Sequence, residues 1–520
     1  MNRTEMIARI RDEKMTWDMV IIGGGATGVG TAIEAASRGY NALLLEQEDF
    51  GKGTSSRSTK LIHGGVRYLK QGNISLVLEA LKERGILHRN APHLVHNLPF
   101  VVPNYDWWEG PFYGIGLKLY DMLAGKEGFG DSRILSKDET LQMIPTIETS
   151  GLRGGVIYFD GQFDDARLII NMAQTAFEQG ATLLNYMPVI SLLKQNDYLT
   201  GVLIKDAESG TEYRIKSRVV INAAGVYTDQ IRQMDDPEER PLISPSQGVH
   251  IVLDRSFLPG TSAIMIPETD DGRVLFAIPW HGRVIVGTTD TPVKEIPLEP
   301  VPMDSELDFL LTHAARYLVK DPTDSDVLST FAGLRPLVNP AGTGNTAALS
   351  RDHTIHISRS GLVTIAGGKW TTYRKMAEDT IDHAAMIAHL DSVASVTTEL
   401  PIHGYHHHSA KFGVYEIYGS DAPALLDLVN ENPVLGEKLH PRLDIEAIQV
   451  SWAIEHELAR TIEDILARRT RSLLLDARAS IEAAPKVAEL MAEILGRSMQ
   501  WQHDQVEAYT KIARNYLIHR

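Results

Sequence analysis

Cysteine is absent from the 520-residue sequence. Without thiols the chain forms no disulfide, offers no thiolate ligand to a metal ion and has no cysteine nucleophile. The absence fits a reducing compartment such as the cytosol. We expect no metal site.

Long apolar runs are also missing. No stretch of about 18 apolar residues is present, so the sequence predicts no transmembrane helix, and residues 1–18 lack the apolar core of a secretory signal. Basic residues are in deficit, because 51 lysines and arginines stand against 67 aspartates and glutamates, a formal net charge of −16. Such a charge disfavours nucleic acid as a partner, whereas a local surface patch would still allow contact with a bilayer.

The first positive feature is a glycine-rich turn between a strand and a helix. Residues 19–45 predict a strand, a helix of small residues and a second strand. Gly23, Gly25 and Gly28 have the G-x-G-x-x-G spacing that lets a pyrophosphate approach a helix N-terminus. Glu46 follows the second strand, where an acid accepts hydrogen bonds from ribose and repels a 2′-phosphate. The pattern predicts a dinucleotide site, with FAD and NAD both open and NADP disfavoured.

Three further segments have features of a ligand site. Residues 55–69 are rich in hydroxyl and small side chains, residues 222–225 (Asn-Ala-Ala-Gly) follow a buried strand, and residues 367–374 form a second glycine turn before a helix. Small residues let a ligand lie against the backbone, and the second turn adds Lys369 and a helix N-terminus. Taken singly, each segment also fits close packing or a surface helix start, so the residues alone leave both interpretations open.

The order of strand and helix patterns predicts an α/β fold. A dinucleotide-binding domain would receive an inserted, antiparallel-rich sheet domain and be followed by a helical domain. The expected division is residues 1–75, the first part of the cofactor domain; 76–150, a helical and aromatic segment that partly caps it; 151–240, its second part; 241–355, the β-rich substrate domain; 356–394, the last part of the cofactor domain; and 395–520, the helical domain.

Several segments together resemble the FAD-dependent glycerol-3-phosphate dehydrogenases. The resemblance extends from about residue 17 to residue 515, and the combination is more specific than any one motif. The segments that carry it are IIGGGATGVGTAIEAASRG, SSRSTKLIHGGVRYL, YFDGQFDDARL, NAAGVYTD, SQGVHIV, FAGLRPLV, GGKWTTYRKMA and IEHELARTIEDILARRTR.

The resemblance implies an FAD-binding Rossmann-like domain of the glutathione-reductase type, an antiparallel-sheet substrate domain and a C-terminal α-helical domain. It also implies FAD as the cofactor. The expected FAD-binding residues are Gly23, Gly25, Thr27, Gly28, Glu46, Ser55, Ser58, Lys60, Leu61, His63, Val189, Gly225, Gly368, Lys369 and Thr371.

The implied reaction is oxidation of sn-glycerol 3-phosphate to dihydroxyacetone phosphate by hydride transfer to FAD. A phosphate dianion requires cations, for which arginine is well suited. The implied substrate-binding residues are Arg67, Tyr68, Arg335, Arg351 and Lys369, and the implied catalytic residues are His250, Arg335 and Lys369.

Alternatives stay open at three of these positions. His250 is the candidate base for the C2 hydroxyl, because a histidine pKa lies near neutrality, yet a lone strand histidine is often a packed core residue and His63 competes for the role. Arg351 also fits an ion pair with Asp352. The late arginines Arg468, Arg469 and Arg471 are interpreted as partners of acids on their own helix.

The resemblance also bears on the electron acceptor. A membrane quinone is expected, and the alternative is an oxidase that reduces O2 to H2O2, a branch that usually carries an extra insertion of tens of residues. An amino-acid oxidase and a non-catalytic flavin protein are the remaining alternatives. We expect a cytoplasmic protein at the inner face of the cell membrane. Residues 105–123 are the candidate contact, with a core segment or a dimer interface as the alternative.

Overall fold

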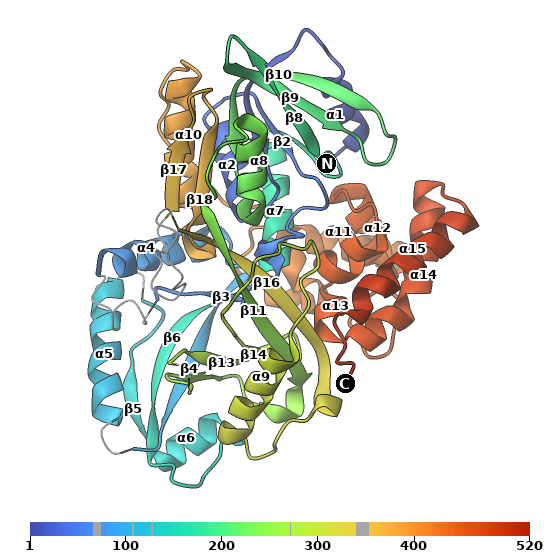
Figure 1. Ribbon diagram of the computed structural model, residues 1–520. Coiled ribbons are helices and arrows are strands. Elements are labelled where there is room, and N and C mark those ends of the chain that lie inside the picture. The colour runs from blue at the N-terminus through green and yellow to red at the C-terminus, as the bar shows by residue number, and fades with distance from the viewer. Residues whose placement is uncertain (66–73, 107–108, 126–127, 271, 340–352) are drawn as a thin grey trace.

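The computed structural model describes residues 1–65, 74–106, 109–125, 128–270, 272–339 and 353–520. The chain forms two sheets, which are stacked end to end in the view of Figure 1, and a group of helices from the C-terminal part of the chain that lies along one side of both. Arg67, Tyr68 and Arg351 lie outside the described residues.

The first sheet has a parallel centre. β1 pairs in parallel with β2 and β10, and β10 in turn pairs in parallel with β18. Its strands, in order across the sheet, are β17 (His353–Ile357), β18 (Val363–Gly367), β10 (Glu212–Asn222), β1 (Thr16–Ile22), β2 (Ala42–Leu45) and β7 (Thr182–Leu184). In addition, β9 (Tyr198–Lys205) pairs antiparallel with β10, and β8 (Val189–Gln195) pairs antiparallel with β9.

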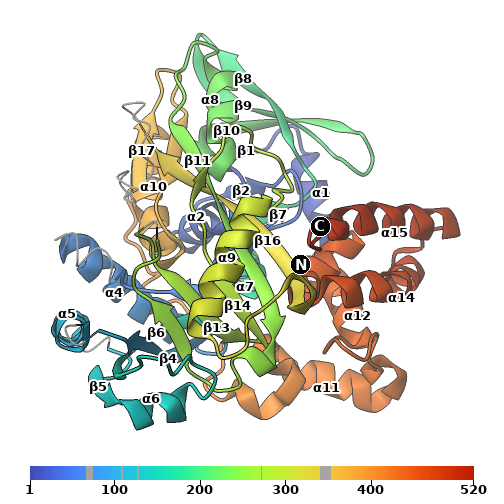
Figure 2. The same ribbon diagram turned by 60° about the horizontal axis from the view of Figure 1, so that its bottom comes forward.

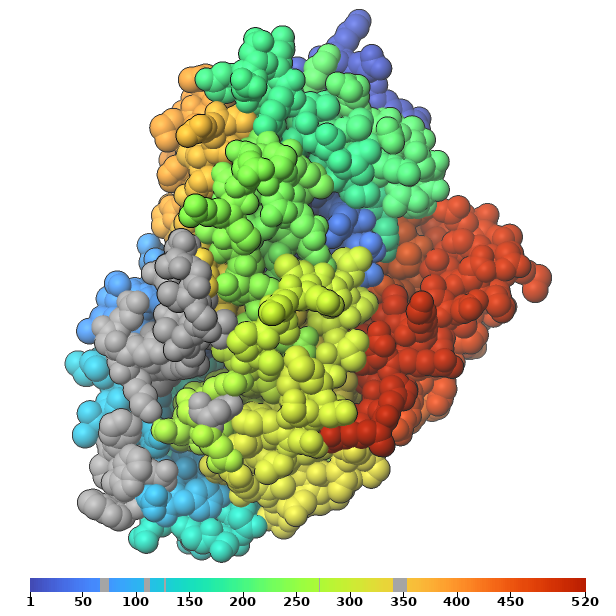
Figure 3. All heavy atoms as spheres, in the orientation of Figure 1, coloured from blue at the N-terminus to red at the C-terminus, as the bar shows by residue number. Residues whose placement is uncertain are grey.

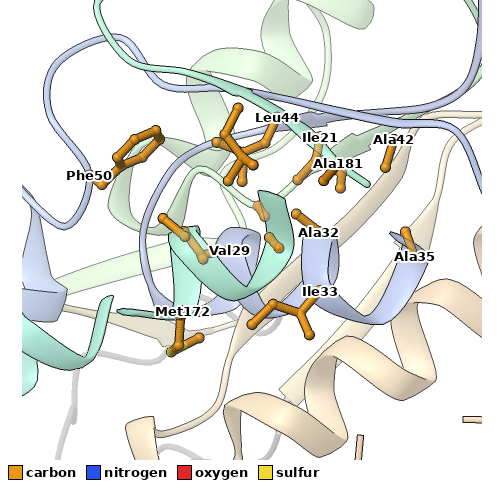
Figure 4. Packing of buried hydrophobic residues seen from close by; sticks show 14 of the residues in the cluster. Ile21, Val29, Ala32, Ile33, Ala35, Ala42, Leu44, Phe50, Met172 and Ala181 are labelled. Atoms are coloured by element: carbon orange, nitrogen blue, oxygen red, sulfur yellow. The ribbon is translucent and has the colours of Figure 1, made fainter. Parts of the chain in front are cut away.

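The strands at the centre of this sheet are buried on both faces, so successive residues of these strands are apolar. This explains the unbroken apolar run in β1. Ile21 and Leu44 of neighbouring strands pack against α2 (Ala26–Ser37). Figure 4 shows Val29 and Ile33 of α2 in the same apolar cluster as Met172 of α7 (Asp165–Glu178). The expected strand, helix and second strand over residues 19–45 are therefore present.

The second sheet is largely antiparallel. Its strands, in order, are β15 (Thr291–Pro292), β11 (Ile243–Asp254), β14 (Arg283–Gly287), β13 (Leu275–Trp280), β12 (Ala263–Ile266), β4 (Val95–Asn104), β6 (Gly154–Phe163) and β3 (Leu61–Ile62), with β16 (Val327–Val338) on β11 and β5 (Arg133–Ser136) on β6.

This sheet draws on more of the chain than the expected domain boundaries suggest. The boundary at residue 151 assigns β6 to the cofactor domain, whereas β6 pairs with β4 over its full length in the second sheet. Likewise β4 and β5 lie within the segment expected to be helical and aromatic. Strand pairing across such distances depends on partners that the local sequence does not contain.

Helices cover both sheets and form the C-terminal part. Around the first sheet lie α1 (Arg3–Ile10), α2, α7 (Asp165–Glu178), α8 (Thr228–Asp235) and α10 (Tyr373–Ile387). The second sheet carries α4 (Ile74–Asn90), α5 (Glu109–Ala124), α6 (Lys137–Met143) and α9 (Asp304–Tyr317). The C-terminal helices are α11 (Ala422–Glu431), α12 (Ala447–His456), α13 (Ser472–Leu475), α14 (Ala477–Leu495) and α15 (Met499–Arg514).

Buried ion pairs join the C-terminal helices to the rest of the chain. Asp49, just after β2, accepts hydrogen bonds from Arg468 and Arg469. Arg471 lies 2.9 Å from Asp164, at the start of α7. Arg468 also pairs with Glu463 and Asp464, and Arg469 Nε lies 3.9 Å from Glu457, so two of the three arginines have a partner among the acids of residues 454–471. Burying charged groups costs free energy, so pairs of this kind add little net stability. Their main effect is to specify how the C-terminal helices dock on the rest of the chain.

The predicted fold class is confirmed: a dinucleotide-binding α/β unit is combined with an antiparallel-rich sheet and C-terminal helices. Among the helices described, none has the length and apolar character needed to span a membrane.

Candidate functional site

The first cavity lies at the carboxyl end of the parallel strands, where the glycine turn leads from β1 into α2. On the face shown in Figure 3, blue atoms of the N-terminal part of the chain are visible in a recess between green and yellow segments. Gly23 has φ +111°. A Cβ on Gly28 would lie 1.8 Å from the Gly23 carbonyl oxygen. Glycine at these positions lets the turn fold tightly against α2.

The N-terminus of α2 faces this cavity. Gly25 is its N-cap and forms no side-chain capping bond, and the Ala26 N–H donates to Ser55 Oγ at 3.0 Å. Gly25 and Thr27 also line the cavity. Uncapped N–H groups and the helix dipole make such an end favourable for a pyrophosphate. The donor set therefore fits a dinucleotide.

Glu46 lies at the end of β2 and also lines the cavity. Its carboxyl accepts hydrogen bonds from the Gly24 N–H at 2.5 Å and the Glu48 N–H at 2.8 Å. Burial raises the pKa of Glu46 to about 7, although these two bonds favour the carboxylate. A ribose hydroxyl that donates to this side chain would favour its charged form further.

The second glycine turn meets the hydroxyl-rich segment. Trp370 Nε1 donates to the Ser55 carbonyl oxygen at 2.8 Å, and Thr371 Oγ1 donates to the His63 carbonyl oxygen at 3.4 Å. Gly368 has φ +79°. Two segments more than 300 residues apart in the chain thus form one wall.

A second cavity of about 320 Å³ adjoins the first. The two share part of their walls, including Gly368, Lys369 and Trp370. A ligand in the second cavity would therefore lie beside the end of a dinucleotide held in the first. Side chains of the second sheet and of the loop before β3 form the rest of its lining.

Arg335 of β16 supplies positive charge to the second cavity. Its guanidinium donates to Thr288 Oγ1 at 3.2 Å and to the Thr289 carbonyl oxygen at 3.0 Å, and it pairs with Asp290 at 3.3 Å. A Cβ on Gly248 would lie 2.5 Å from Arg335 Nη2, so a glycine is needed for the arginine to cross β11. These contacts fix the position of the guanidinium at the wall of the cavity.

His250 of β11 is one of two histidines that line the second cavity, with His63, and is 2% exposed. Its ring stacks on Phe331 with centroids 4.6 Å apart, and Nε2 lies 2.9 Å from Thr59 Oγ1. Burial, followed by the Lys60 and Arg335 cations, lowers the pKa of His250 well below its usual range. The imidazole is therefore neutral and can accept a proton.

Most of the expected site residues line one or both cavities. The first cavity has Gly23, Gly25, Thr27, Glu46, Ser55, Val189 and Gly225; the second has Ser58, Leu61, His63, His250, Arg335 and Thr371; Gly368 and Lys369 line both. Gly28 and Lys60 are absent from both linings. Gly28 packs against the first turn, and the Lys60 ammonium binds Asp165 at 2.7 Å with no exposed surface.

Sequence reasoning missed several residues of the second cavity. Thr59, Thr288, Asp290 and Arg273 line it without having been singled out. Thr59 lies inside the hydroxyl-rich run that drew attention to residues 55–69, so composition pointed to its neighbourhood. The others come from strands and loops of the second sheet with no local signal.

Comparisons with known proteins agree with this geometry. Residues 18–374 match the family model described as FAD dependent oxidoreductase, and residues 360–503 match the C-terminal domain of alpha-glycerophosphate oxidase. The mitochondrial glycerol-3-phosphate dehydrogenase of Mus musculus is 39% identical over 96% of this chain and 73% of its own length. That of Schizosaccharomyces pombe is also 39% identical, over 96% of this chain and 87% of its own.

A solved structure is similar over almost the whole chain. The glycerol-3-phosphate dehydrogenase from Bacillus halodurans, a complex with FAD, has a TM-score of 0.81 and 29% sequence identity. The match covers 99% of this chain and 97% of that one. The likeness therefore includes both sheets and the C-terminal helices.

Proposed function

Because this chain belongs to the family of FAD-dependent glycerol-3-phosphate dehydrogenases, we propose that it oxidises sn-glycerol 3-phosphate to dihydroxyacetone phosphate and passes the electrons to a membrane quinone. The observation that carries the proposal is the junction of the two cavities at Gly368 and Lys369. A small anion in the second cavity would lie beside the reactive end of a cofactor in the first, as transfer between them requires.

The residues of the first cavity fit FAD. The N-terminus of α2 would hold the pyrophosphate, and Glu46 would accept hydrogen bonds from the ribose. When bound, FAD supplies the two-electron acceptor for the hydride that leaves C2 of the substrate. Gly28 and Lys60 would act from outside the lining by shaping the turn and the loop before β3.

In the second cavity we assign the substrate phosphate to Arg335 and Lys369, with Arg67, Tyr68 and Arg351 as further proposed ligands. Both cations attract a phosphate dianion, although Asp290 offsets part of the charge of Arg335, and a phosphate would have to replace some of the present partners of the guanidinium. His250 accepts the proton of the C2 hydroxyl while C2 loses its hydride. Its place in the lining of the second cavity supports this role, whereas the lowered pKa, which leaves the imidazole neutral, also makes its protonated form less stable.

Anaerobic addition of glycerol 3-phosphate to the purified holoenzyme tests the reaction. We expect loss of the visible flavin absorbance, with one dihydroxyacetone phosphate formed for each flavin reduced. Glycerol and an amino acid such as glycine serve as controls and should leave the spectrum unchanged. A flavin that glycerol 3-phosphate does not reduce would rule out the proposed substrate.

The same reduced enzyme tests the acceptor. A soluble quinone analogue should restore the flavin absorbance much faster than air-saturated buffer does. Rapid recolouring by oxygen with formation of H2O2 would instead assign the chain to the oxidase alternative.

An exposed apolar patch supports contact with a membrane. Ile115, Leu119 and Met122 project from α5, and Ile134 of β5 lies beside Gly114 of the same helix. Ile115 is 74% exposed and Met122 76%. In Figures 1 and 2, α5 lies at the outer edge of the molecule. We propose that this patch rests on the cytoplasmic face of the membrane, where the quinone is dissolved.

Liposome flotation tests the patch. The double variant Ile115→Lys with Met122→Lys should bind lipid about tenfold more weakly than the wild type. The reason is that two apolar side chains are no longer transferred from water to the membrane. Met499→Lys is the matched control, since Met499 is 83% exposed in the C-terminal region. Equal flotation of the double variant and the control would exclude α5 as the membrane contact. We also propose that the protein forms a homodimer, and sedimentation of the wild-type protein without lipid tests this.

A further inference from the structure

Thr59 is the hydrogen-bonding partner of His250. Its hydroxyl Oγ1 lies 2.9 Å from His250 Nε2, and both residues line the second cavity. The two are 191 residues apart in the chain. Thr59 is half-buried, whereas His250 is buried, so the threonine is the more accessible of the pair to a ligand in the cavity.

The position of Thr59 is set by bonds on both sides of it. Asp165 accepts hydrogen bonds from the Ser58 N–H at 3.1 Å and Ser58 Oγ at 2.7 Å. The same carboxylate accepts from the Lys60 ammonium at 2.7 Å, and Lys60 also donates to the Ser56 carbonyl oxygen. Because one buried acid binds both neighbours, the backbone at Thr59 has little freedom to turn its hydroxyl away.

The ring of His250 is equally restricted. It stacks on Phe331, whose ring lies 5.1 Å from the Lys60 ammonium. On its other side the ring lies against Gly287 of β14. A Cβ on Gly287 would lie 2.2 Å from His250 Cδ2, so the ring fits there only because this residue has no side chain. His250 Nδ1 is buried and has no hydrogen-bond partner among the residues that the structure describes. Proton exchange with the cavity therefore takes place through Nε2.

We propose that the Thr59 hydroxyl relays the proton from the C2 hydroxyl of the substrate to His250. The inference rests on the proposed function, and it requires the tautomer in which Nδ1 carries the hydrogen and Nε2 accepts from Thr59. The C2–H bond breaks and its electron pair leaves as hydride to the flavin, while C2 and its oxygen form a carbonyl. The hydroxyl proton passes to Thr59 Oγ1, and the proton of Thr59 passes to His250 Nε2.

Three variants test the relay in the holoenzyme. Thr59→Val removes the hydroxyl and keeps the shape, Thr59→Ser keeps the hydroxyl, and Thr182→Val is the matched control. Thr182 is a buried threonine of β7 whose hydroxyl has no hydrogen-bond partner among the described residues. Flavin content and melting temperature are measured for each, and so is the dissociation constant of dihydroxyacetone phosphate from its effect on the flavin spectrum.

We expect Thr59→Val to lower the rate of anaerobic flavin reduction at saturating substrate by about 100-fold, the lower end of the roughly 10²–10⁴-fold that general acid–base catalysis contributes. Thr59→Ser and Thr182→Val should stay close to the wild-type rate, and product affinity should not change in any variant. A Thr59→Val enzyme as fast as wild type, or a Thr59→Ser enzyme as slow as Thr59→Val, overturns the relay. So does a loss of affinity without a loss of rate.

A measurement on the unmodified enzyme keeps the test independent of folding. The reduction rate in mixtures of H2O and D2O should follow a curved dependence on the deuterium fraction, because two protons move in the relay. A linear dependence would mean that only one proton moves, and this result would overturn the relay. If glycerol 3-phosphate does not reduce the wild-type flavin at all, the proposed function fails; if wild type is reduced and Thr59→Val is reduced equally fast, only the relay fails.

Discussion

The two cavities share a wall but are built in different ways. The cofactor cavity is shaped mainly by backbone, at glycine turns where a Cβ would meet main-chain atoms at less than 3 Å. The substrate cavity is shaped by side chains such as Arg335 and His250, held by hydrogen bonds and stacking. We infer that the cofactor cavity tolerates little change in shape. In the substrate cavity, by contrast, a substitution can remove the function of a side chain and leave the shape of the cavity unchanged.

The largest expected effect is that of Gly28→Ala, which lies behind the glycine turn of the cofactor cavity. The new Cβ would lie 1.8 Å from the Gly23 carbonyl oxygen, and neither the turn nor α2 can shift without loss of the site. We expect little or no bound flavin and a free energy of unfolding lower by about 1–3 kcal/mol or more. Flavin absorbance and thermal unfolding measure both effects.

Gly116→Ala is the control for this substitution. Gly116 lies in α5, and a Cβ there meets no atom within 4 Å. In a helix, alanine is more favourable than glycine, so stability should be equal or slightly higher. A Gly28→Ala protein with full flavin content would contradict the inference that the cofactor cavity tolerates little change in shape.

An intermediate effect is expected from Arg335→Met in the substrate cavity. Flavin content should stay at the wild-type level, whereas the dissociation constant of dihydroxyacetone phosphate should rise about 10- to 100-fold, because a hydrogen bond to a charged group is worth about 1.5–3 kcal/mol. The flavin spectrum reports binding. Arg316→Gln, which breaks an exposed pair with Asp270, should change neither quantity. Loss of flavin from Arg335→Met would show that the two cavities are not separable.

The smallest effect concerns pH and Glu46. Its pKa is raised from 4.5 to about 7, so in the cofactor-free protein the associated stability is present below pH 4.5 and is lost as the pH rises through 7. A ribose bound to the carboxylate favours the ionised form. The affinity for FAD should therefore fall about fivefold to tenfold between pH 8 and pH 6. Titration with FAD measures this, and Glu46→Gln should give a nearly flat profile.

Much of the cofactor cavity could be predicted from sequence, and much less of the substrate cavity. Gly23, Gly25 and Glu46 belong to one continuous βαβ segment whose register follows from local patterns, and the structure places all three in one lining. Arg335 and His250 were expected in the site only through resemblance to a family. Their neighbour Thr288 was not expected at all, because no periodicity relates it to them.

The arginines of the late helical segment show the same limit. Local spacing predicted partners on their own helix, and Arg468 does pair with Glu463 and Asp464. Arg469 has Glu457 of the same segment at 3.9 Å, yet its closer partner is Asp49, and Arg471 pairs with Asp164; both of these acids lie in distant parts of the chain. Burial makes these distant partners necessary, since an unpaired buried charge is costly, and local spacing contains no information about docking.

The sequence by itself determined the dinucleotide turn, the buried parallel strands and the order of the three structural parts, because glycine spacing and apolar periodicity act over a few residues. Only the tertiary structure decided which side chains meet at the substrate cavity. Thr59 reaches His250 because β3 pairs with β6, β11 pairs with β14 and β16, and Asp165 holds the loop between them. Hydrogen bonds are short and directional, so these contacts exist only after distant strands have paired in register.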